Sequence, residues 1–223
     1  MTWLVIERPG VKLYKPLYQT TKRILDLTFC LVAMPFILPL GLIIAILIRL
    51  GSSGPILFVQ ERIGKGGRRF KMFKFRTMHH HIDRDTHRVF MKAFINGQAS
   101  AKDEHQVFKP FDKSQITFIG RILRKTSLDE LPQLINIFRG EMSLIGPRPN
   151  VPWEVEEYKG WHKERLEVLP GITGLAQVRG RSGILFDEIV QYDIEYIEKQ
   201  SLGLDLRILW WTFASVLMGR GAH

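Results

Sequence analysis

An uncharged run over residues 27–48 constrains this chain more than any other feature of its sequence. As a single helix, the run would be about 33 Å long, which is enough to cross the hydrocarbon core of a bilayer. It is too long for the apolar region of a signal peptide, and no small-residue cleavage site follows it. The run therefore predicts a membrane segment, and its length makes the buried helix of a soluble core the weaker alternative.

Two features of the run argue against a simple spanning helix. Pro35 and Pro39, followed by Gly41, remove backbone hydrogen bonds and bend a helix. Both flanks are also basic, and basic flanks favour the cytoplasmic side of a membrane. The flanking basic residues are Lys22, Arg23, Arg49, Arg62, Lys65, Arg68, Arg69, Lys71, Lys74 and Arg76. A helix that enters the membrane, breaks at the prolines and returns satisfies both observations.

The charge balance predicts an anionic partner. The chain has 32 basic residues against 22 acidic ones, a formal net charge of +10. Nucleic acid, an anionic membrane face and phosphorylated substrates all fit this excess. The single cysteine, Cys30, excludes an intrachain disulfide and fits a reducing compartment.

A pair of adjacent carboxylates, Asp129 and Glu130, lies between basic residues and a Pro-Arg-Pro sequence. Ser127 precedes Glu130 by three residues, the spacing of a capping box, which predicts the first turn of a helix. Unpaired N–H groups and the positive helix dipole there suit an anion. Because Pro132 lacks an N–H, this helix either bends or starts later, with Asp129 as its cap. The alternative is that Glu130 is only a capping residue.

Arg148 stands between Pro147 and Pro149. The two prolines hold the backbone extended, so the arginine side chain leaves it in a fixed direction. An arginine held in this way suits bidentate binding of a phosphate.

Residues 56–60 and 69–76 predict a hairpin around 64–67. The alternation in RFKMFKFR places basic residues largely on one face and aromatic residues on the other. Such a ribbon presents charge to an anion or lies against lipid headgroups, and both interpretations stay open.

The second half of the chain reads as mostly helical. Helices are expected over residues 116–124, 151–168 and 187–198, and a turn-rich loop over 169–181 carries Arg179 and Arg181. Asp205 can cap the last helix. That helix carries an apolar stripe, which suits either a core or a membrane interface. The stripe comprises Leu206, Leu209, Trp210, Phe213 and Leu217.

Residues 79–113 say little about function. Three consecutive histidines, with Asp83 and Asp85 nearby, invite a metal site. Consecutive histidines point in different directions and the usual ligand spacings are absent, so a mixed polar helix or lid with a mobile loop is the better interpretation.

Taken together, the motifs resemble those of the bacterial sugar transferase family, the monotopic phosphoglycosyl transferases. The resemblance covers roughly residues 22–221 and is weakest over 79–113. The matching blocks are KRILD, GPILFVQERIG, FKFRTM, LRKTSLDELPQL, GEMSLIGPRP, PGITGLAQV and the terminal GRG. So many blocks in order are far more specific than any single short motif.

The resemblance implies a mainly α fold with a small β-hairpin, a monotopic membrane protein with amphipathic interfacial helices. Residues 1–21, which mix apolar and basic side chains, are expected to form an interfacial or flexible segment. For the rest of the chain, the resemblance implies a re-entrant membrane helix (22–50) and a cytoplasmic catalytic domain with interfacial helices (51–223). The location it implies is the cytoplasmic face of a bacterial inner membrane. A homo-oligomer is left open.

The resemblance also implies an activity. Family members transfer a sugar-1-phosphate from a UDP-sugar to undecaprenyl or another polyprenyl phosphate, release UMP and require Mg²⁺. This chemistry initiates the synthesis of exopolysaccharide, O-antigen or a glycoconjugate. The catalytic dyad falls on Asp129 and Glu130, with Asp129 as a nucleophile that forms a covalent phosphosugar intermediate. Both carboxylates are candidate metal ligands. The substrate-phosphate positions fall on Lys74, Arg124, Arg148 and Arg181.

Three departures from the family pattern bear on these expectations. Leu38 precedes Pro39 where members often carry serine, so the angle of the break is open. The family's Gly-Arg-Asn ends in Ser182, and Arg179 replaces an asparagine, so the sugar is not fixed.

Two other hypotheses compete with this activity. The first is a catalytically silent membrane scaffold of the same fold, which the intact carboxylate pair and basic positions disfavour. The second is a basic nucleic-acid-binding protein. The long uncharged run and the lack of a nucleic-acid motif argue against it, so we expect no nucleic-acid partner.

Overall fold

A computed structural model describes residues 15–79, 85–97, 115–180 and 184–218 of the chain. The α-helices are α1 (Pro16–Gly51), α2 (Asp85–Ile95), α3 (Phe118–Thr126), α4 (Leu134–Phe138), α5 (Pro152–Glu156), α6 (Leu175–Arg179), α7 (Phe186–Glu198) and α8 (Leu202–Leu217). The strands are β1 (Leu57–Ile63), β2 (Arg69–Phe75), β3 (Ser143–Ile145) and β4 (Gly171–Thr173). Short 3₁₀ helices are η1 (Lys65–Gly67), η3 (Leu128–Gln133) and η4 (Gly160–Leu166). The predicted mainly α class with a small hairpin is confirmed.

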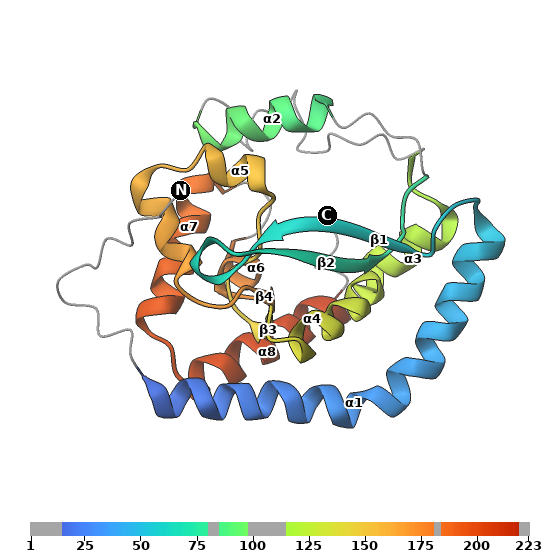
Figure 1. The fold of residues 1–223 in the computed structure, drawn as a ribbon, viewed down its shortest axis with the longest axis horizontal. Helices are drawn as coiled ribbons and strands as arrows, with labels where there is room; N and C mark the ends of the chain where they lie inside the picture. The colour runs from blue at the N-terminus through green and yellow to red at the C-terminus, as the bar shows by residue number, and fades with distance from the viewer. Residues whose placement is uncertain (1–14, 80–84, 98–114, 181–183, 219–223) are drawn as a thin grey trace.

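Helix α1 is one continuous helix with a bend. It begins at Pro16 and contains both Pro35 and Pro39. Figure 1 shows two arms that meet at an angle, with the other elements gathered on the inner side. Proline removes an intrahelical hydrogen bond and is a common cause of such bends. The predicted break is therefore a bend within α1, and the re-entrant topology stays a prediction.

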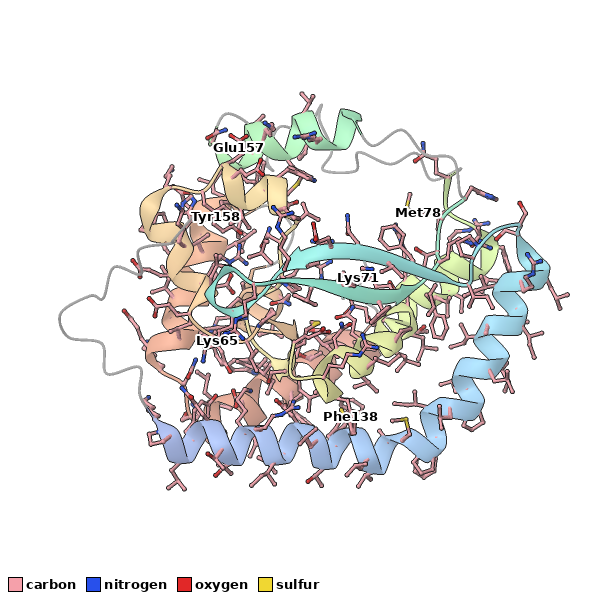
Figure 2. All side chains as sticks on the ribbon, in the orientation of Figure 1. Lys65, Lys71, Met78, Phe138, Glu157 and Tyr158 are labelled. Carbon is pink, nitrogen blue, oxygen red and sulfur yellow. The ribbon has the colours of Figure 1, made fainter. Side chains whose placement is uncertain are left out.

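The outer surface of α1 is apolar and exposed. Its length and composition suffice to cross a membrane, and only 11% of its most apolar window is buried. Side chains project from it away from the rest of the molecule (Figure 2). The apolar residues of α1 that are at least half exposed include Leu31, Val32, Phe36, Leu38, Leu42 and Ile43. Burial in a soluble core is therefore excluded for this face.

The predicted hairpin is confirmed. Strands β1 and β2 pair antiparallel from Leu57 opposite Phe75 to Ile63 opposite Arg69. The connection contains Gly66 and Gly67 at φ of 66° and 76°, a conformation that favours glycine.

The two faces of β2 match the expectation only in the first half of the strand. Arg69 and Lys71 are exposed, while Phe70 and Met72 are buried. Alternate residues of a strand share a face, so Lys74 lies on the side of Phe70 and Met72. The predicted separation of basic and aromatic residues is right for the first half of β2, at Arg69 and Lys71. It is wrong for the second half, where Lys74 lies on the side of Phe70 while Phe73 and Phe75 alternate onto the side of Arg69.

Helix α2 confirms a helix within residues 79–113. Phe94 and Ile95 of α2 are buried in one core with Val155 of α5 and with Phe186 and Val190 of α7. The rest of that segment, including two of the three histidines, lies outside the described residues.

A second small sheet was not predicted. Strands β3 and β4 pair in parallel, with Ser143 opposite Gly171 and Ile145 opposite Thr173. A Cβ on Gly171 would collide with the backbone of Gly146, so the absence of a side chain permits this pairing. The segment 169–181, expected as a loop, instead supplies β4 and α6.

The single helix expected over 151–168 is wrong, because the chain breaks between α5 and η4. Lys159 is extended, with ψ of 160°, and Gly160 begins η4. The break lets Tyr158 and Arg165 meet in the interior, where Arg165 Nη1 donates to the Tyr158 hydroxyl at 3.0 Å.

The expectation that Asp205 caps the last helix is also wrong. The Ser201 hydroxyl caps α8 by accepting from Leu204 N–H at 3.3 Å. Asp205 is buried one turn further on, where it accepts hydrogen bonds from Tyr18 and Lys22 of α1 at 2.9 and 3.0 Å. Its position ties α1 to α8. The apolar stripe of α8 is exposed at Leu206, Leu209, Trp210 and Phe213.

Candidate active site

The structure brings five of the six predicted site positions together: the carboxylate pair and three of the four predicted basic residues. Asp129 and Glu130 lie in the first turn of η3, which packs against β2. Lys74 comes from β2, Arg124 from α3, and Arg148 from the chain after β3. Arg181, the remaining predicted position, lies outside the described residues.

The local structure of the pair differs from the predicted capping box. Ser127 has φ of 57° and ends α3, and its side chain makes no capping bond. Its backbone makes the contacts instead: its carbonyl accepts from Glu130 N–H at 3.2 Å, and its N–H donates to the Arg124 carbonyl at 3.3 Å. The capping box is therefore wrong. Pro132 lies inside η3, and α4 starts later, at Leu134, with Gln133 rather than Asp129 at its N-terminus.

Glu130 is engaged by two cations. Lys74 Nζ donates to Glu130 Oε1 at 2.6 Å, and Arg148 Nη1 lies 3.7 Å from the same oxygen. Burial raises the pKa of Glu130, but the charges of Lys74 and Arg148 outweigh burial and leave this pKa below its ordinary value. Glu130 is therefore held as a carboxylate.

Asp129 has a different environment. No lysine, arginine or histidine nitrogen of the described residues lies within ion-pair distance of its carboxylate. Burial raises the pKa of Asp129 above its ordinary value; the charge of Lys74 opposes this, and the neighbouring Glu130 adds to it. Arg124 also lowers the pKa. The two adjacent carboxylates thus have pKa values displaced in opposite directions, a pattern typical of acid, base or nucleophile pairs.

Arg124 is fixed by side chains near the end of the hairpin. Its Nε donates to the Thr77 hydroxyl at 3.1 Å, and its Nη2 lies 3.1 Å from the sulfur of Met78. These contacts leave Nη1 free of a protein partner among the described residues. Arg124 can therefore bind an anion beside Asp129.

Two buried arginines that the sequence analysis did not assign to the site hold the Pro-Arg-Pro segment. Arg62 Nη1 donates to the Pro149 carbonyl at 2.9 Å, and Arg165 Nη2 donates to the Arg148 carbonyl at 3.2 Å. The carbonyls of two consecutive residues, Arg148 and Pro149, are thus held by arginines from η4 and β1. Arg62 falls within the QERIG block, which could have indicated it, whereas the sequence gives no comparable signal for Arg165.

The chemistry of the carboxylate pair fits the binding of a magnesium ion, which enzymes acting on phosphates commonly hold through one or two carboxylates. No cluster of three or more histidine, cysteine or acidic side chains occurs in the described part of the chain. Magnesium is usually bound through one or two carboxylates plus waters and substrate phosphates, so a larger cluster is not required. Asp129 has the freer oxygens, because Lys74 and Arg148 occupy Glu130.

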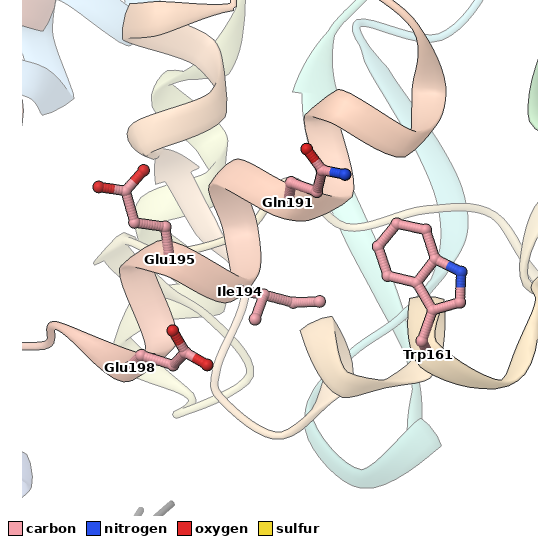
Figure 3. Close-up of a pocket in the computed structure, with 5 residues that line it drawn as sticks. All are labelled: Trp161, Gln191, Ile194, Glu195 and Glu198. Atoms are coloured by element: carbon pink, nitrogen blue, oxygen red, sulfur yellow. The ribbon is translucent and has the colours of Figure 1, made fainter.

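A pocket of about 360 Å³ is lined by none of the predicted site residues. Figure 3 shows its lining residues on η4 and α7. These are Trp161, Gln191, Ile194, Glu195 and Glu198. Glu195 is paired with Arg179 and Lys199 at 3.2 and 3.0 Å, so this pocket offers no free cation for a phosphate.

Comparison with known proteins identifies the family. The model of the family described as bacterial sugar transferase matches residues 17–219. Exopolysaccharide production protein ExoY of Sinorhizobium fredii is 37% identical over 209 residues, 94% of this chain and 91% of that protein. UDP-glucose:undecaprenyl-phosphate glucose-1-phosphate transferase of Caulobacter vibrioides is 38% identical over 230 residues, 100% of this chain and 79% of that protein.

A third relative is longer. Galactosyl transferase CpsE of Streptococcus agalactiae is 38% identical over 214 residues, 96% of this chain and 46% of that protein. The chain thus spans about half the length of this relative and most of the other two. The match over nearly the whole chain shows that the protein belongs to the bacterial sugar transferase family, a family of phosphoglycosyl transferases.

Proposed function

We propose that this protein transfers a sugar-1-phosphate from a UDP-sugar to undecaprenyl or another polyprenyl phosphate, and so initiates synthesis of an exopolysaccharide or related glycoconjugate. The names of the Caulobacter and Sinorhizobium relatives support the reaction and its role. The exposed apolar surfaces of α1 and α8 support action at a membrane on a lipid acceptor.

The observation that carries the mechanism is the unequal environment of the two carboxylates. Glu130 is neutralised by Lys74 at 2.6 Å, whereas Asp129 has no such partner in the described structure. A nucleophile needs accessible, unpaired oxygens, and Asp129 meets this requirement. Glu130 instead keeps Lys74 and Arg148 beside Asp129.

The reaction then proceeds in two balanced steps. An oxygen of Asp129 attacks the β-phosphorus of the UDP-sugar, and the bond from that phosphorus to the bridging oxygen breaks. UMP leaves with the bonding electrons, and an aspartyl phosphosugar remains. A phosphate oxygen of the lipid attacks the same phosphorus, which forms the lipid diphosphate sugar and frees the Asp129 carboxylate.

The surrounding cations stabilise the negative charge that develops on the phosphate oxygens in these steps. Arg124 and Arg148 lie where they can bind the oxygens of the donor diphosphate, and Lys74 reduces the repulsion between this dianion and the carboxylates. Arg181 remains an expected phosphate ligand. When bound, magnesium supplies further neutralisation of the phosphate oxygens. Asp129, with Glu130, would hold this ion.

Location at the cytoplasmic face of a bacterial inner membrane remains part of this proposal. It follows from the basic residues at both ends of the apolar run of α1, which favour the cytoplasmic side. A re-entrant α1, seated in the inner leaflet, would place both ends there.

The test separates the two steps by omitting the acceptor. Purified protein in detergent with magnesium is offered UDP-glucose, UDP-galactose and UDP-N-acetylgalactosamine in turn. A two-step enzyme releases at most one UMP per protein and gains the mass of a sugar phosphate. Undecaprenyl phosphate then gives turnover. Asp129→Asn should show neither adduct nor turnover.

Other outcomes of this test are also informative. UMP release that strictly requires the acceptor, with no adduct, would contradict the covalent step. An Asp129→Asn variant that turns over like the wild type would exclude this nucleophile. A folded protein that reacts with none of the donors would favour the silent scaffold.

A further inference from the structure

Arg76, at the end of β2, is a buried cation without a counter-charge among the described residues. The residue is 6% exposed. Its Nη2 donates to the carbonyl and the hydroxyl of Ser52, both at 2.8 Å. Its Nε and Nη1 are buried and have no hydrogen-bond partner in the described structure. Buried donors without partners are rare and usually mark a bound water, ion or ligand.

The electrostatic surroundings of Arg76 point to an anion rather than to water alone. Burial and the neighbouring charge of Arg49 both lower the pKa of Arg76, and no carboxylate offsets them. Other buried arginines differ in this respect. Arg165 pairs with Asp193 at 2.6 Å. Burial and the charge of Arg148 lower the pKa of Arg62 to about 10, but the carboxylates of Glu154 and Glu130 oppose this shift. A buried charge of this kind is costly unless an opposite charge joins it.

An apolar pocket is linked to this cation through Ser52. It has a volume of about 280 Å³ and lies between the end of α1 and the start of α3. Ser52, which binds Arg76, is one of its walls. The other lining residues are Leu47, Ile48, Leu50, Gly51, Thr117, Phe118 and Ile119. The pocket continues the exposed apolar surface formed by Leu50 of α1 and Phe118 of α3, which are 80% and 68% exposed.

The cation is also connected to the candidate active site. Thr77, the next residue in the chain, accepts the hydrogen bond from Arg124 Nε. Arg124 is one of the charges that lower the pKa of Asp129. Gly120 of α3 fits so closely against the Thr77 carbonyl that a Cβ there would collide with it. A group bound at Arg76 therefore lies next to the segment that fixes Arg124.

We propose that Arg76 and Arg49 bind the phosphate of the lipid acceptor, and that the pocket between α1 and α3 holds the first part of its isoprenoid chain. This inference rests on the proposed function and adds the acceptor subsite to it. Such a ligand combines an anion for the unpaired guanidinium with an apolar tail for this pocket. The UDP-sugar donor has no apolar tail and fits this combination poorly.

The two-step reaction allows the subsite to be tested separately from the nucleophile. Exchange of labelled UMP into the UDP-sugar reports the first step and needs no acceptor. Full turnover at varied undecaprenyl phosphate reports the second. The variants are Arg76→Gln and Arg76→Lys, with Arg69→Gln as control. Arg69 is an exposed arginine at the other end of β2, and it pairs with Glu61 at 3.2 Å.

We expect Arg76→Gln to raise the KM for undecaprenyl phosphate about tenfold or more, because a charge-assisted contact is lost. Exchange should persist in this variant and serves as the measure of correct folding. Arg76→Lys should restore part of the acceptor affinity, and Arg69→Gln should leave both activities as in the wild type.

A second variant tests the tail pocket. A Cβ on Gly51 would lie 3.6 Å from Ile119, so Gly51→Leu fits the backbone and projects toward the opposite wall. We expect it to raise the KM for undecaprenyl phosphate while exchange continues. Gly51→Ala is the matched control, since its methyl group makes only an ordinary contact.

The outcomes separate this inference from the proposed function. No exchange in the wild type would overturn the two-step reaction itself. If every variant exchanges UMP and has the wild-type KM for undecaprenyl phosphate, the proposed acceptor subsite is wrong, while the two-step reaction stands. If phosphatidylglycerol in mixed micelles inhibits the wild type but not Arg76→Gln, the occupant is bulk anionic lipid, and the acceptor assignment is wrong.

Discussion

Lys74 and Glu130, which lie 56 residues apart in the sequence, form an ion pair of 2.6 Å between β2 and η3. Their side chains are only 15% and 19% exposed. The pair fixes the 3₁₀ turn that carries Asp129 to the hairpin. It therefore links the stability of the fold to the geometry of the candidate nucleophile.

The first prediction concerns the removal of Lys74. Lys74→Met leaves Glu130 buried with only Arg148, at 3.7 Å, to balance it. We expect a loss of about 2–3 kcal/mol in the free energy of unfolding, somewhat below the range for fully buried pairs. Urea unfolding in detergent, followed by tryptophan fluorescence, measures this. Lys74→Met/Glu130→Gln should lose less than the sum of the single variants, and strict additivity would contradict the pairing.

The pH dependence of this pair has a defined sign. The pKa of Glu130 is lowered on folding, so its contribution to stability is present above the unfolded value near 4.5. It is lost as the pH falls through the lower folded value. Below about pH 4.5 we expect the free energy of unfolding to fall more steeply in the wild type than in Glu130→Gln, because glutamine has no carboxylate to protonate. Parallel curves for the two proteins would contradict this.

The second prediction concerns the pH dependence of the first chemical step. Asp129 must be ionised to attack, and its pKa is raised mainly by burial. UMP exchange should therefore rise with pH through an apparent pKa above that of free aspartate. Arg124 lowers the pKa of Asp129, so Arg124→Gln should move this acid limb to higher pH as well as reduce the rate. If the acid limb of the pH profile lies at the same pH in Arg124→Gln as in the control Arg69→Gln, Arg124 does not act on the Asp129 carboxylate.

The parts of the fold that the sequence predicted correctly are those set by local patterns. Glycines at 66 and 67 specify the hairpin turn, and the apolar run specifies α1. The same patterns place Asp129 and Glu130 in a first turn, although as a 3₁₀ turn without the serine cap. The position of the carboxylate pair at the start of a helical turn was therefore predicted from a contiguous motif, and its role in the site stays a prediction.

The errors arise where distant segments meet. The position of Asp205 in the sequence predicts a helix cap, but in the structure Asp205 is buried and accepts hydrogen bonds from Tyr18 and Lys22 of α1. The helix expected over 151–168 is interrupted so that Tyr158 and Arg165 can share one core. Periodicity within a segment carries no information about such partners, which is also why Arg165 was missed.

The third prediction concerns the buried pair of Arg165 and Asp193. Their side chains are 2% and 1% exposed, and the charged atoms are 2.6 Å apart. Asp193→Ala would leave Arg165 buried without its counter-charge, so we expect a loss of about 3–5 kcal/mol in the free energy of unfolding. Arg165→Met/Asp193→Leu removes both charges and should recover part of that stability.

Activity in that double variant gives an independent readout. Arg165 Nη2 also holds the Arg148 carbonyl at 3.2 Å, and methionine cannot replace this bond. We expect kcat/KM for the UDP-sugar to stay reduced, about tenfold or more, even where stability returns. Recovery of both stability and activity would mean that Arg165 does not position Arg148.

The fourth prediction compares two glycines with opposite surroundings. A Cβ on Gly171 of β4 would collide with the backbone of Gly146 in the loop after β3, and this loop leads directly to Arg148. Gly203 of α8 has nothing within 4 Å of the same position. Gly171→Ala must push the two strands apart, and we expect it to cost about 3 kcal/mol or more of folding free energy. Gly203→Ala should be neutral or stabilise by about 0.5–1 kcal/mol, because alanine reduces the freedom of the unfolded chain. Thermal unfolding of the two variants under the same detergent conditions measures the difference, and equal melting temperatures would show that the close approach of β3 and β4 is not required.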